Sequence, residues 1–257
     1  MAHLVVDYYA DALGVQTRMH VLLPQRLAAG KAKTLYLLHG MSDDEGTWMR
    51  RTSIERYAEE KGLAVVMPDG GLGWYTDMYR GLAWFKFISG ELPALCRRFF
   101  PILSDKREDT YIGGNSMGGY GALKCALRAP QTFSKVISLS GALDAADTAI
   151  NNTVPATRRY WEDVFGPAED VSGSENDLFA AATALTDPAL RPRIYMWCGT
   201  EDFLYAQNIR MRDHLRALGY DLTYEESPGD HQWRHWDKKI ADALNWLLPG
   251  EGEDAWR

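Results

Sequence analysis

Short apolar segments recur along the chain, and their residue patterns predict β-strands. Four of them are continuous apolar runs, as expected for strands that a sheet buries on both faces. Two others flank Gly14 and are predicted to form an antiparallel pair at the edge of the sheet. The eight predicted strands cover residues 4–9, 19–23, 34–39, 63–68, 110–112, 136–140, 193–198 and 222–225.

Segments with apolar residues at helical spacing alternate with these strands. Ser89 is expected to cap a helix that runs to residue 100, and Gly219 is expected to follow the end of another helix. The predicted helices cover residues 51–61, 89–100, 122–128, 204–218 and 235–248. This alternation predicts an α/β fold, with a mostly parallel sheet and helices on both of its faces.

One interval between predicted strands is too long for a plain connection. Residues 144–192 are polar, contain only short helical patterns and are broken by Pro155, Gly166, Pro167 and Pro188. We predict that this interval is a small cap inserted over the carboxyl edge of the sheet. The chain has the length of one domain of ordinary core size, so residues 1–257 are predicted to form a single domain.

Composition and charge narrow the class of protein. Apolar residues make up 46% and charged residues 25% of the chain, as is typical of globular proteins. The net charge of −7, without a lysine–arginine cluster, argues against nucleic acids and anionic membranes as partners. No signal peptide or membrane-spanning run is visible, and three scattered cysteines indicate reduced thiols. We therefore expect a cytoplasmic protein.

The segment from Gly113 to Gly121 is the most informative motif. Ser116 stands between two glycines in the pattern G-x-S-x-G, after an apolar strand and before a helical segment. Such a strand–turn–helix unit projects the serine hydroxyl outward, next to the first N–H groups of the helix. A phosphate-binding glycine turn is the alternative. However, G-x-x-x-x-G-K-[ST] does not occur in the chain, and the motif does not open the first βαβ unit.

A nucleophilic serine needs a histidine base and an acid that orients the histidine. Asp202 follows the strand at 193–198 and is the acid that we select, with Glu201 as its adjacent competitor. Of the six histidines, only His231 lies in a loop after the last strand, in the chain order serine, acid, histidine. A helix-capping aspartate and a structural histidine are the alternative interpretations. The matching strand-end positions favour a catalytic triad.

The end of the strand at 34–39 predicts an oxyanion hole. Gly40 lets the backbone turn, so that the N–H of Met41 can point at a substrate oxygen. The N–H of Met117, next to the nucleophile, would be the second donor. His39 is interpreted as a buttress for this loop rather than as a base.

Aromatic residues crowd the predicted loops. Trp74 and Tyr75 lie in a glycine-rich loop on the expected active edge, where they could line the acyl or alcohol pocket. Trp233 flanks the base and completes, with Gly40, the predicted substrate-binding set. Trp236 is interpreted as a core residue.

Three consecutive acidic residues follow the oxyanion loop: Asp43, Asp44 and Glu45. Paired carboxylates suggest a metal site, but a solvated turn is the interpretation that we favour. Neither a metal nor a cofactor is predicted.

Together these motifs resemble the esterase D branch of the α/β-hydrolases, close to bacterial tributyrin esterases and related to S-formylglutathione hydrolases and family 1 carbohydrate esterases. The resembling stretches span nearly the whole chain: residues 36–42, 73–77, 116–121, 197–199 and 202–205, and His231 with Trp233 and Trp236. The resemblance implies the α/β-hydrolase fold, catalysis without a cofactor, and Ser116, Asp202 and His231 as nucleophile, acid and base. Asn115 departs from the apolar residue expected before the nucleophile.

Residues and resemblance together predict a serine carboxylesterase for small-molecule esters with short acyl groups, from acetyl to butyryl. Esters of acetylated or feruloylated plant oligosaccharides are included in this expectation. An S-formylglutathione hydrolase and an acyltransferase stay open as alternatives. A non-catalytic binding module is a different class, but such a chain would be expected to lack a triad residue. The sequence leaves open the acyl chain, the alcohol and whether a homo-oligomer forms.

Overall fold

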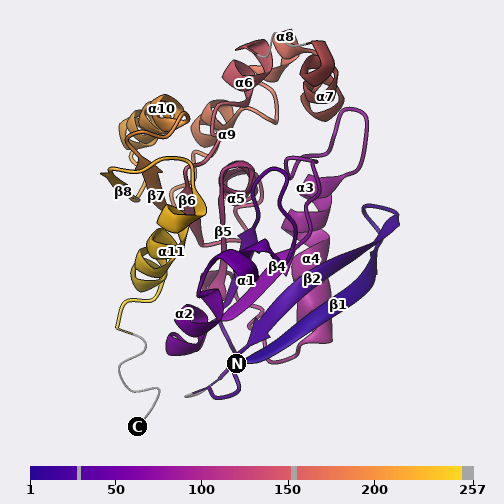
Figure 1. The fold of residues 1–257 in the computed structure, drawn as a ribbon, viewed down its shortest axis with the longest axis vertical. Coiled ribbons are helices and arrows are strands. Elements are labelled where there is room, and N and C mark those ends of the chain that lie inside the picture. The colour runs from indigo at the N-terminus through magenta and orange to yellow at the C-terminus, as the bar shows by residue number, and fades with distance from the viewer. Residues whose placement is uncertain (28–29, 152–154, 251–257) are drawn as a thin grey trace.

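The structure is a computed structural model that describes residues 1–27, 30–151 and 155–250 (Figure 1). Its centre is an eight-stranded sheet in the order β1-β2-β4-β3-β5-β6-β7-β8. β1 pairs with β2 and β2 with β4 in antiparallel fashion, and all other neighbours are parallel. The strands are β1 (Ala2–Ala10), β2 (Val15–Leu23), β3 (Thr34–Leu38), β4 (Ala64–Pro68), β5 (Thr110–Asn115), β6 (Lys135–Leu139), β7 (Arg193–Gly199) and β8 (Leu222–Ser227). The predicted mostly parallel eight-stranded sheet is confirmed.

The central strands are apolar throughout because successive side chains point to opposite faces of the sheet and both faces are covered. In β3, Tyr36 and Leu38 join one buried cluster, whereas Leu35 and Leu37 join the other. Each such side chain contributes about 2 kcal/mol when it is fully buried. The edge pair is also as predicted, with Gly14 at a φ of 70° in the turn between β1 and β2.

Helices cover both faces of this sheet (Figure 1). The buried side chains of α4, α5 and α10 belong to the first cluster, and those of α2 and α11 belong to the second. The helices outside the interval between β6 and β7 are α1 (Thr47–Arg51), α2 (Ile54–Glu60), α3 (Trp84–Lys86), α4 (Leu92–Phe99), α5 (Met117–Arg128), α10 (Tyr205–Ala217) and α11 (Trp233–Leu247). None of the helices in the described ranges is long and apolar enough to cross a membrane.

Some helices begin where the sequence pattern did not indicate. The helix expected to start at Ser89 begins at Trp84 and continues through a π-helical turn, in which Ser89 Oγ donates to the Phe85 carbonyl oxygen at 2.7 Å. Ser89 is therefore not its cap. α5 begins at Met117 and not at residue 122. The sequence pattern did not indicate this start, because the first turn is rich in glycine and has no apolar periodicity. Gly219 follows α10 with a φ of 74°, as predicted.

Two other boundaries differ from the predicted ones. The helix expected over residues 51–61 begins at Ile54 as α2, and α1, which was not predicted, ends before it because Thr52 has an extended backbone with a φ of −139°. α11 begins at Trp233, two residues before the expected start at His235.

In the described part of the interval between β6 and β7, for which a cap was predicted, there are four helices: α6 (Ala145–Asn151), α7 (Pro155–Phe165), α8 (Ala168–Val171) and α9 (Leu178–Ala184). In Figure 1, α6, α7 and α8 lie at the top, beyond the end of the sheet. An ion pair of 2.8 Å between Asp144 and Arg210 ties the start of the interval to α10. Residues 152–154 of this interval lie outside the described residues.

Candidate active site

Ser116 stands in a strained turn between β5 and α5. Its φ of 53° and ψ of −118° are rarely adopted by residues other than glycine, and such strain costs about 1–3 kcal/mol. Neighbouring glycines make the turn possible. A Cβ atom on Gly118 would overlap the carbonyl oxygen of Leu38, and one on Gly114 would lie 2.7 Å from the same oxygen. β3 and α5 thus meet closely around the serine.

Three side chains from separate loops meet at the carboxyl edge of the sheet. His231 Nε2 lies 3.0 Å from Ser116 Oγ, and His231 Nδ1 lies 2.8 Å from Asp202 Oδ2. Asp202 Oδ1 accepts a hydrogen bond from the N–H of Leu204 at 2.9 Å, which holds the carboxylate in place. With Nδ1–H donating to the carboxylate, Nε2 carries a lone pair that can accept the serine proton. The structure thus brings together the three residues that the sequence singled out.

The surroundings of these residues limit their access to water. The Asp202 side chain has no exposed surface, and that of His231 is 18% exposed. The ring of Trp236 packs edge-on against the imidazole with a centroid distance of 4.8 Å, and the ring of Phe203 lies on it at 4.6 Å. Trp236 is buried, as expected of a core residue, and donates from Nε1 to Ser140 Oγ. A low local dielectric strengthens the interaction between the carboxylate and the imidazole.

A buried histidine shapes the predicted oxyanion loop. His39 donates from Nδ1 to the Gly40 carbonyl oxygen at 2.8 Å and accepts the Gly70 N–H at Nε2 at 2.9 Å. This tautomer is assigned from the partners, because a backbone N–H can only donate. In a trans peptide the C=O and N–H point in opposite directions, so holding the Gly40 carbonyl also orients the Met41 N–H. The Tyr75 hydroxyl donates to the His39 carbonyl oxygen at 2.9 Å and supports the same loop.

The other predicted oxyanion donor is the first residue of α5. The N–H of Met117 has no helical carbonyl one turn before it, and the helix N-terminus adds a partial positive charge. The oxyanion loop runs directly beside the nucleophile, because a Cβ atom on Gly40 would lie 3.6 Å from Ser116 Cβ. Met41 follows Gly40, which lies beside the serine, and Met117 follows the serine itself. This arrangement is suited to binding a developing oxyanion.

The aromatic loop after β4 lies mostly beneath the surface of the site. Tyr75 has no exposed surface, and its ring fills the space that a side chain on Gly70 or Gly121 would need. The prediction that Tyr75 lines the substrate pocket is therefore wrong, because its ring is a support enclosed by other residues. Trp74 is 4% exposed and donates from Nε1 to the Tyr160 hydroxyl at 2.8 Å, so it too contributes little surface.

Trp233 is partly exposed and packs between two other tryptophans. Its ring centroid lies 4.9 Å from that of Trp48 and 5.1 Å from that of Trp236. No ligand contact of Trp233 or Gly40 follows from this packing, so their substrate-binding roles stay predictions.

Glu201, the rejected competitor of Asp202, joins the acid loop to the histidine loop. Its N–H donates to the Gly229 carbonyl oxygen at 3.1 Å, and its carboxylate accepts the Gly229 N–H at 2.5 Å. The hydrogen bond from Gly229 lowers the pKa of the Glu201 carboxyl. Two adjacent acidic residues look alike in the sequence, and only the path of the turn decides which of them faces the imidazole.

A residue that the sequence analysis missed is Lys124 of α5. Its side chain is buried, and Nζ donates to Thr76 Oγ1 and Asn176 Oδ1, each at 2.5 Å. These contacts tie the nucleophile helix to the aromatic loop and to the interval between β6 and β7. Burial lowers the pKa of Lys124 to about 8. No sequence signal points to this role, since a lysine in a helix is normally at the surface.

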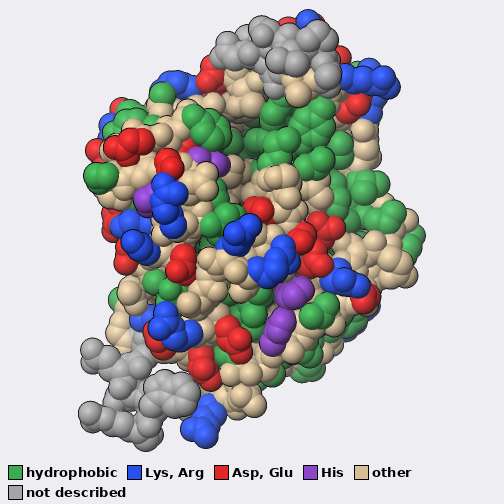
Figure 2. Space-filling view, viewed as in Figure 1, with side chains coloured by type: hydrophobic (Ala, Val, Ile, Leu, Met, Phe, Trp, Pro, Cys, Tyr) green, Lys and Arg blue, Asp and Glu red, His purple; other side chains and the backbone are tan. Residues whose placement is uncertain are grey.

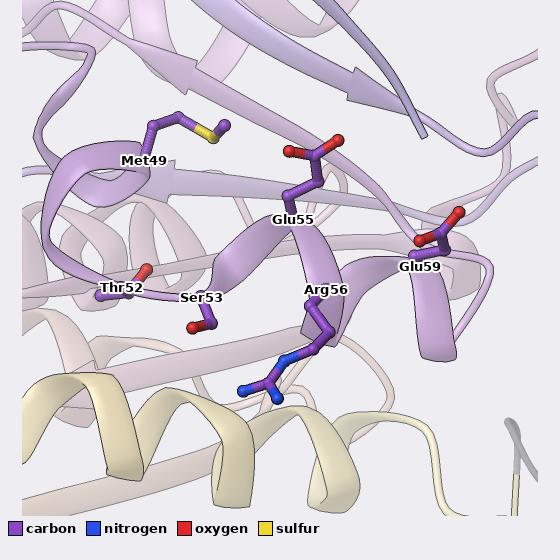
Figure 3. Close-up of a pocket in the computed structure, with 6 residues that line it drawn as sticks. All are labelled: Met49, Thr52, Ser53, Glu55, Arg56 and Glu59. Atoms are coloured by element: carbon purple, nitrogen blue, oxygen red, sulfur yellow. The ribbon is translucent and has the colours of Figure 1, made fainter.

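A separate surface hollow lies beside α1 and α2 and is lined by Met49, Thr52, Ser53, Glu55, Arg56 and Glu59 (Figure 3). It contains none of the triad residues and no histidine that could activate one of its hydroxyls. Within the described ranges, no group of three or more His, Cys, Asp or Glu side chains is placed to hold a metal ion. The arrangement around Ser116 is therefore the candidate active site.

Comparisons with known proteins identify esterases and serine hydrolases as similar to this chain. The family model described as "Putative esterase" matches residues 10–247. The chain is 34% identical to an acetyl esterase from Caldicellulosiruptor saccharolyticus, over 96% of this chain and 98% of that protein. Among solved structures, the fluorophosphonate-binding serine hydrolase FphF from Staphylococcus aureus has a TM-score of 0.88 and 34% identity, with 96% of this chain and 98% of that chain covered.

A second structure from the same organism, the S-formylglutathione hydrolase FrmB, has a TM-score of 0.85 at 34% identity and the same coverage of both chains. These similarities confirm the resemblance that the sequence motifs indicated. The chain therefore belongs to this esterase family of the α/β-hydrolase superfamily, and it is a serine-type carboxylic ester hydrolase.

Proposed function

We propose that the chain hydrolyses esters of short acyl groups, from acetyl to butyryl, through an acyl-enzyme on Ser116. The observation that carries the proposal is the hydrogen-bonded series from Ser116 Oγ through His231 to the buried Asp202. The acetyl esterase with 34% identity supports an acyl group at the small end of this range.

The first half of the reaction forms the acyl-enzyme. Ser116 Oγ attacks the ester carbonyl carbon while His231 Nε2 takes the hydroxyl proton, and the carbonyl oxygen becomes an oxyanion. The N–H groups of Met41 and Met117 stabilise this oxyanion, and each such donor contributes about 3 kcal/mol to the transition state. The C–O bond to the alcohol then breaks as His231 gives its proton to the departing oxygen.

The second half releases the acid. Water attacks the acyl carbon while His231 Nε2 accepts one of its protons, and the same proton returns to Ser116 Oγ as the acyl group leaves. In both halves the Asp202 carboxylate holds the imidazole in the required tautomer and stabilises the imidazolium.

Aromatic packing between the loop after β4 and α7 is a reason to propose a short acyl group. Trp74 packs against Trp161 and Phe165 of α7 with centroid distances of 4.9 and 5.7 Å. We propose that the acyl group lies toward these rings, which would leave little room for a long chain. Figure 2 shows apolar side chains gathered on this face, just below its top.

Other substrates and partners remain part of the proposal. Acetylated or feruloylated plant oligosaccharides are candidate sources of the ester, and S-formylglutathione is the thioester alternative, supported by the FrmB structure. We propose a cytoplasmic location, because all three cysteines are buried and none forms a disulfide. No nucleic acid or membrane is part of the proposed function, and a homo-oligomer is compatible with it.

The test is hydrolysis of p-nitrophenyl acetate, butyrate and octanoate by the wild-type chain and by Ser116→Ala. We expect turnover of acetate and butyrate to exceed that of octanoate and to fall on the order of 10⁵-fold in the variant. Ser172→Ala, which changes an exposed serine outside the site, should retain full activity. Retained hydrolysis by Ser116→Ala would refute the nucleophile. Faster turnover of S-formylglutathione, or acyl transfer to an added alcohol in preference to water, would favour the alternatives.

A further inference from the structure

Phe203 lies in the loop between β7 and α10 and is 76% exposed, more than any other large apolar side chain within the described residues. Exposure by itself says little, since single apolar residues are common on protein surfaces. The informative feature is the contact of Phe203 with the proposed base. Its ring lies on the His231 imidazole at a centroid distance of 4.6 Å and an angle of 50°.

Backbone hydrogen bonds anchor the turn that carries this ring. Asp202 donates its N–H to the Gly199 carbonyl oxygen at 3.1 Å, and its own carbonyl oxygen accepts the Tyr205 N–H at 2.9 Å. The Leu204 N–H donates to Asp202 Oδ1, so hydrogen bonds fix both neighbours of Phe203. An exposed ring on an anchored turn presents a preformed apolar surface to a ligand.

The reaction geometry determines which part of an ester meets this surface. His231 Nε2 must give its proton to the leaving oxygen, so that oxygen comes within hydrogen-bond distance of the imidazole. The first carbons of the alcohol are then next to the rings that flank His231. Trp236 is buried and offers almost no surface to a ligand, whereas Phe203 is exposed. The alcohol and the ring of Phe203 therefore occupy the same side of the site.

We propose that Phe203 contacts the alcohol part of the ester and selects apolar, above all aromatic, alcohols over small polar ones. The inference rests on the proposed function, because it assumes that His231 protonates the leaving group. Among the substrates of the proposed function, it favours neutral esters whose alcohol carries a flat apolar group over oligosaccharide esters, whose alcohol is a polar sugar. A charged leaving group would gain nothing from such a surface.

The experiment compares benzyl acetate with ethyl acetate, which share the acyl group and have leaving alcohols of similar basicity. We expect the ratio of kcat/KM for benzyl acetate to that for ethyl acetate to fall about tenfold in Phe203→Ala. Truncation removes the contact between two aromatic rings, and the loss of such a contact corresponds to a change of about this size. Phe203→Leu should restore part of the ratio. Benzyl alcohol should inhibit the wild-type chain more strongly than the alanine variant. Phe99→Ala, which removes an exposed phenylalanine on α4, should leave the ratio unchanged.

Two outcomes would overturn the inference. An equal loss for both esters, with a shifted pH profile of kcat, would make Phe203 a positioning residue for His231 only. An unchanged ratio in Phe203→Ala would show that the alcohol does not touch the ring. Failure of the proposed function is distinguishable, because neither acetate would then be hydrolysed in a manner that depends on Ser116.

Discussion

Lys124 offers a test of how burial changes the charge behaviour of a side chain inside this fold. Its side chain is 2% exposed, and its hydrogen-bond acceptors, Thr76 Oγ1 and Asn176 Oδ1, are both neutral. Burial disfavours the charged ammonium and lowers its pKa from the ordinary 10.5 of a lysine to about 8. We predict that Lys124→Met removes a pH dependence of stability that this group alone produces.

The size and sign of the effect follow from proton linkage. A difference of about 2.5 pH units between unfolded and folded chains corresponds to about 3 kcal/mol, a cost present in full below the folded pKa. Between the folded and the unfolded pKa the unfolded chain binds more protons, so the stability of the folded wild-type chain rises with pH. Hydrogen bonds from the lysine oppose this cost by about 1–3 kcal/mol, so the variant should have nearly wild-type stability at pH 7.

The assay is chemical denaturation of both chains at several pH values between 7 and 10. Relative to Lys124→Met, the wild-type chain should gain about 2 kcal/mol of unfolding free energy across this range. Lys31→Met, at an exposed lysine, is the matched control and should follow the wild-type curve. If the unfolding free energies of the wild-type chain and Lys124→Met change with pH in parallel, the reasoning is refuted. Parallel curves would show that the pKa of Lys124 is the same in the folded and the unfolded chain.

Two further predictions concern the loops around the triad. Gly118→Ala should lower the unfolding free energy by about 3 kcal/mol, because its Cβ would overlap the Leu38 carbonyl oxygen and lie 2.7 Å from that of His39. Gly90→Ala, with open space at its Cβ, should not destabilise the chain, and equal unfolding midpoints for the two variants would contradict the clash. Glu201→Ala should lower kcat about fivefold, because Gly229 loses an acceptor that positions the His231 loop, whereas Glu201→Gln should stay near wild type. Steady-state kinetics is the measurement, and a Glu201→Gln variant as impaired as Glu201→Ala would show that the negative charge matters and not the hydrogen bond.

Much of the fold could be read from local patterns. Continuous apolar runs identified the central strands, because a strand covered on both faces has no reason to alternate with polar residues. Helix starts were harder to locate, since Gly118, Gly119 and Gly121 in the first turns of α5 mask its periodicity. Of these three, Gly118 allows the close approach to β3. Ser89 was predicted to be a cap because serine is common at the residue before a helix, but the helix begins earlier, at Trp84.

The sequence by itself determined the nucleophile motif and the family, because such motifs consist of residues that are neighbours along the chain. The sequence favoured Asp202 over Glu201, but only the tertiary structure shows which of them faces His231, that Tyr75 is enclosed and that Lys124 is buried. Ser116 and His231 are 115 positions apart, and no local periodicity records which side chains such a distance brings together. Packing decides it, because strand pairing and the turns after β5, β7 and β8 set the direction of each side chain only once the sheet has formed.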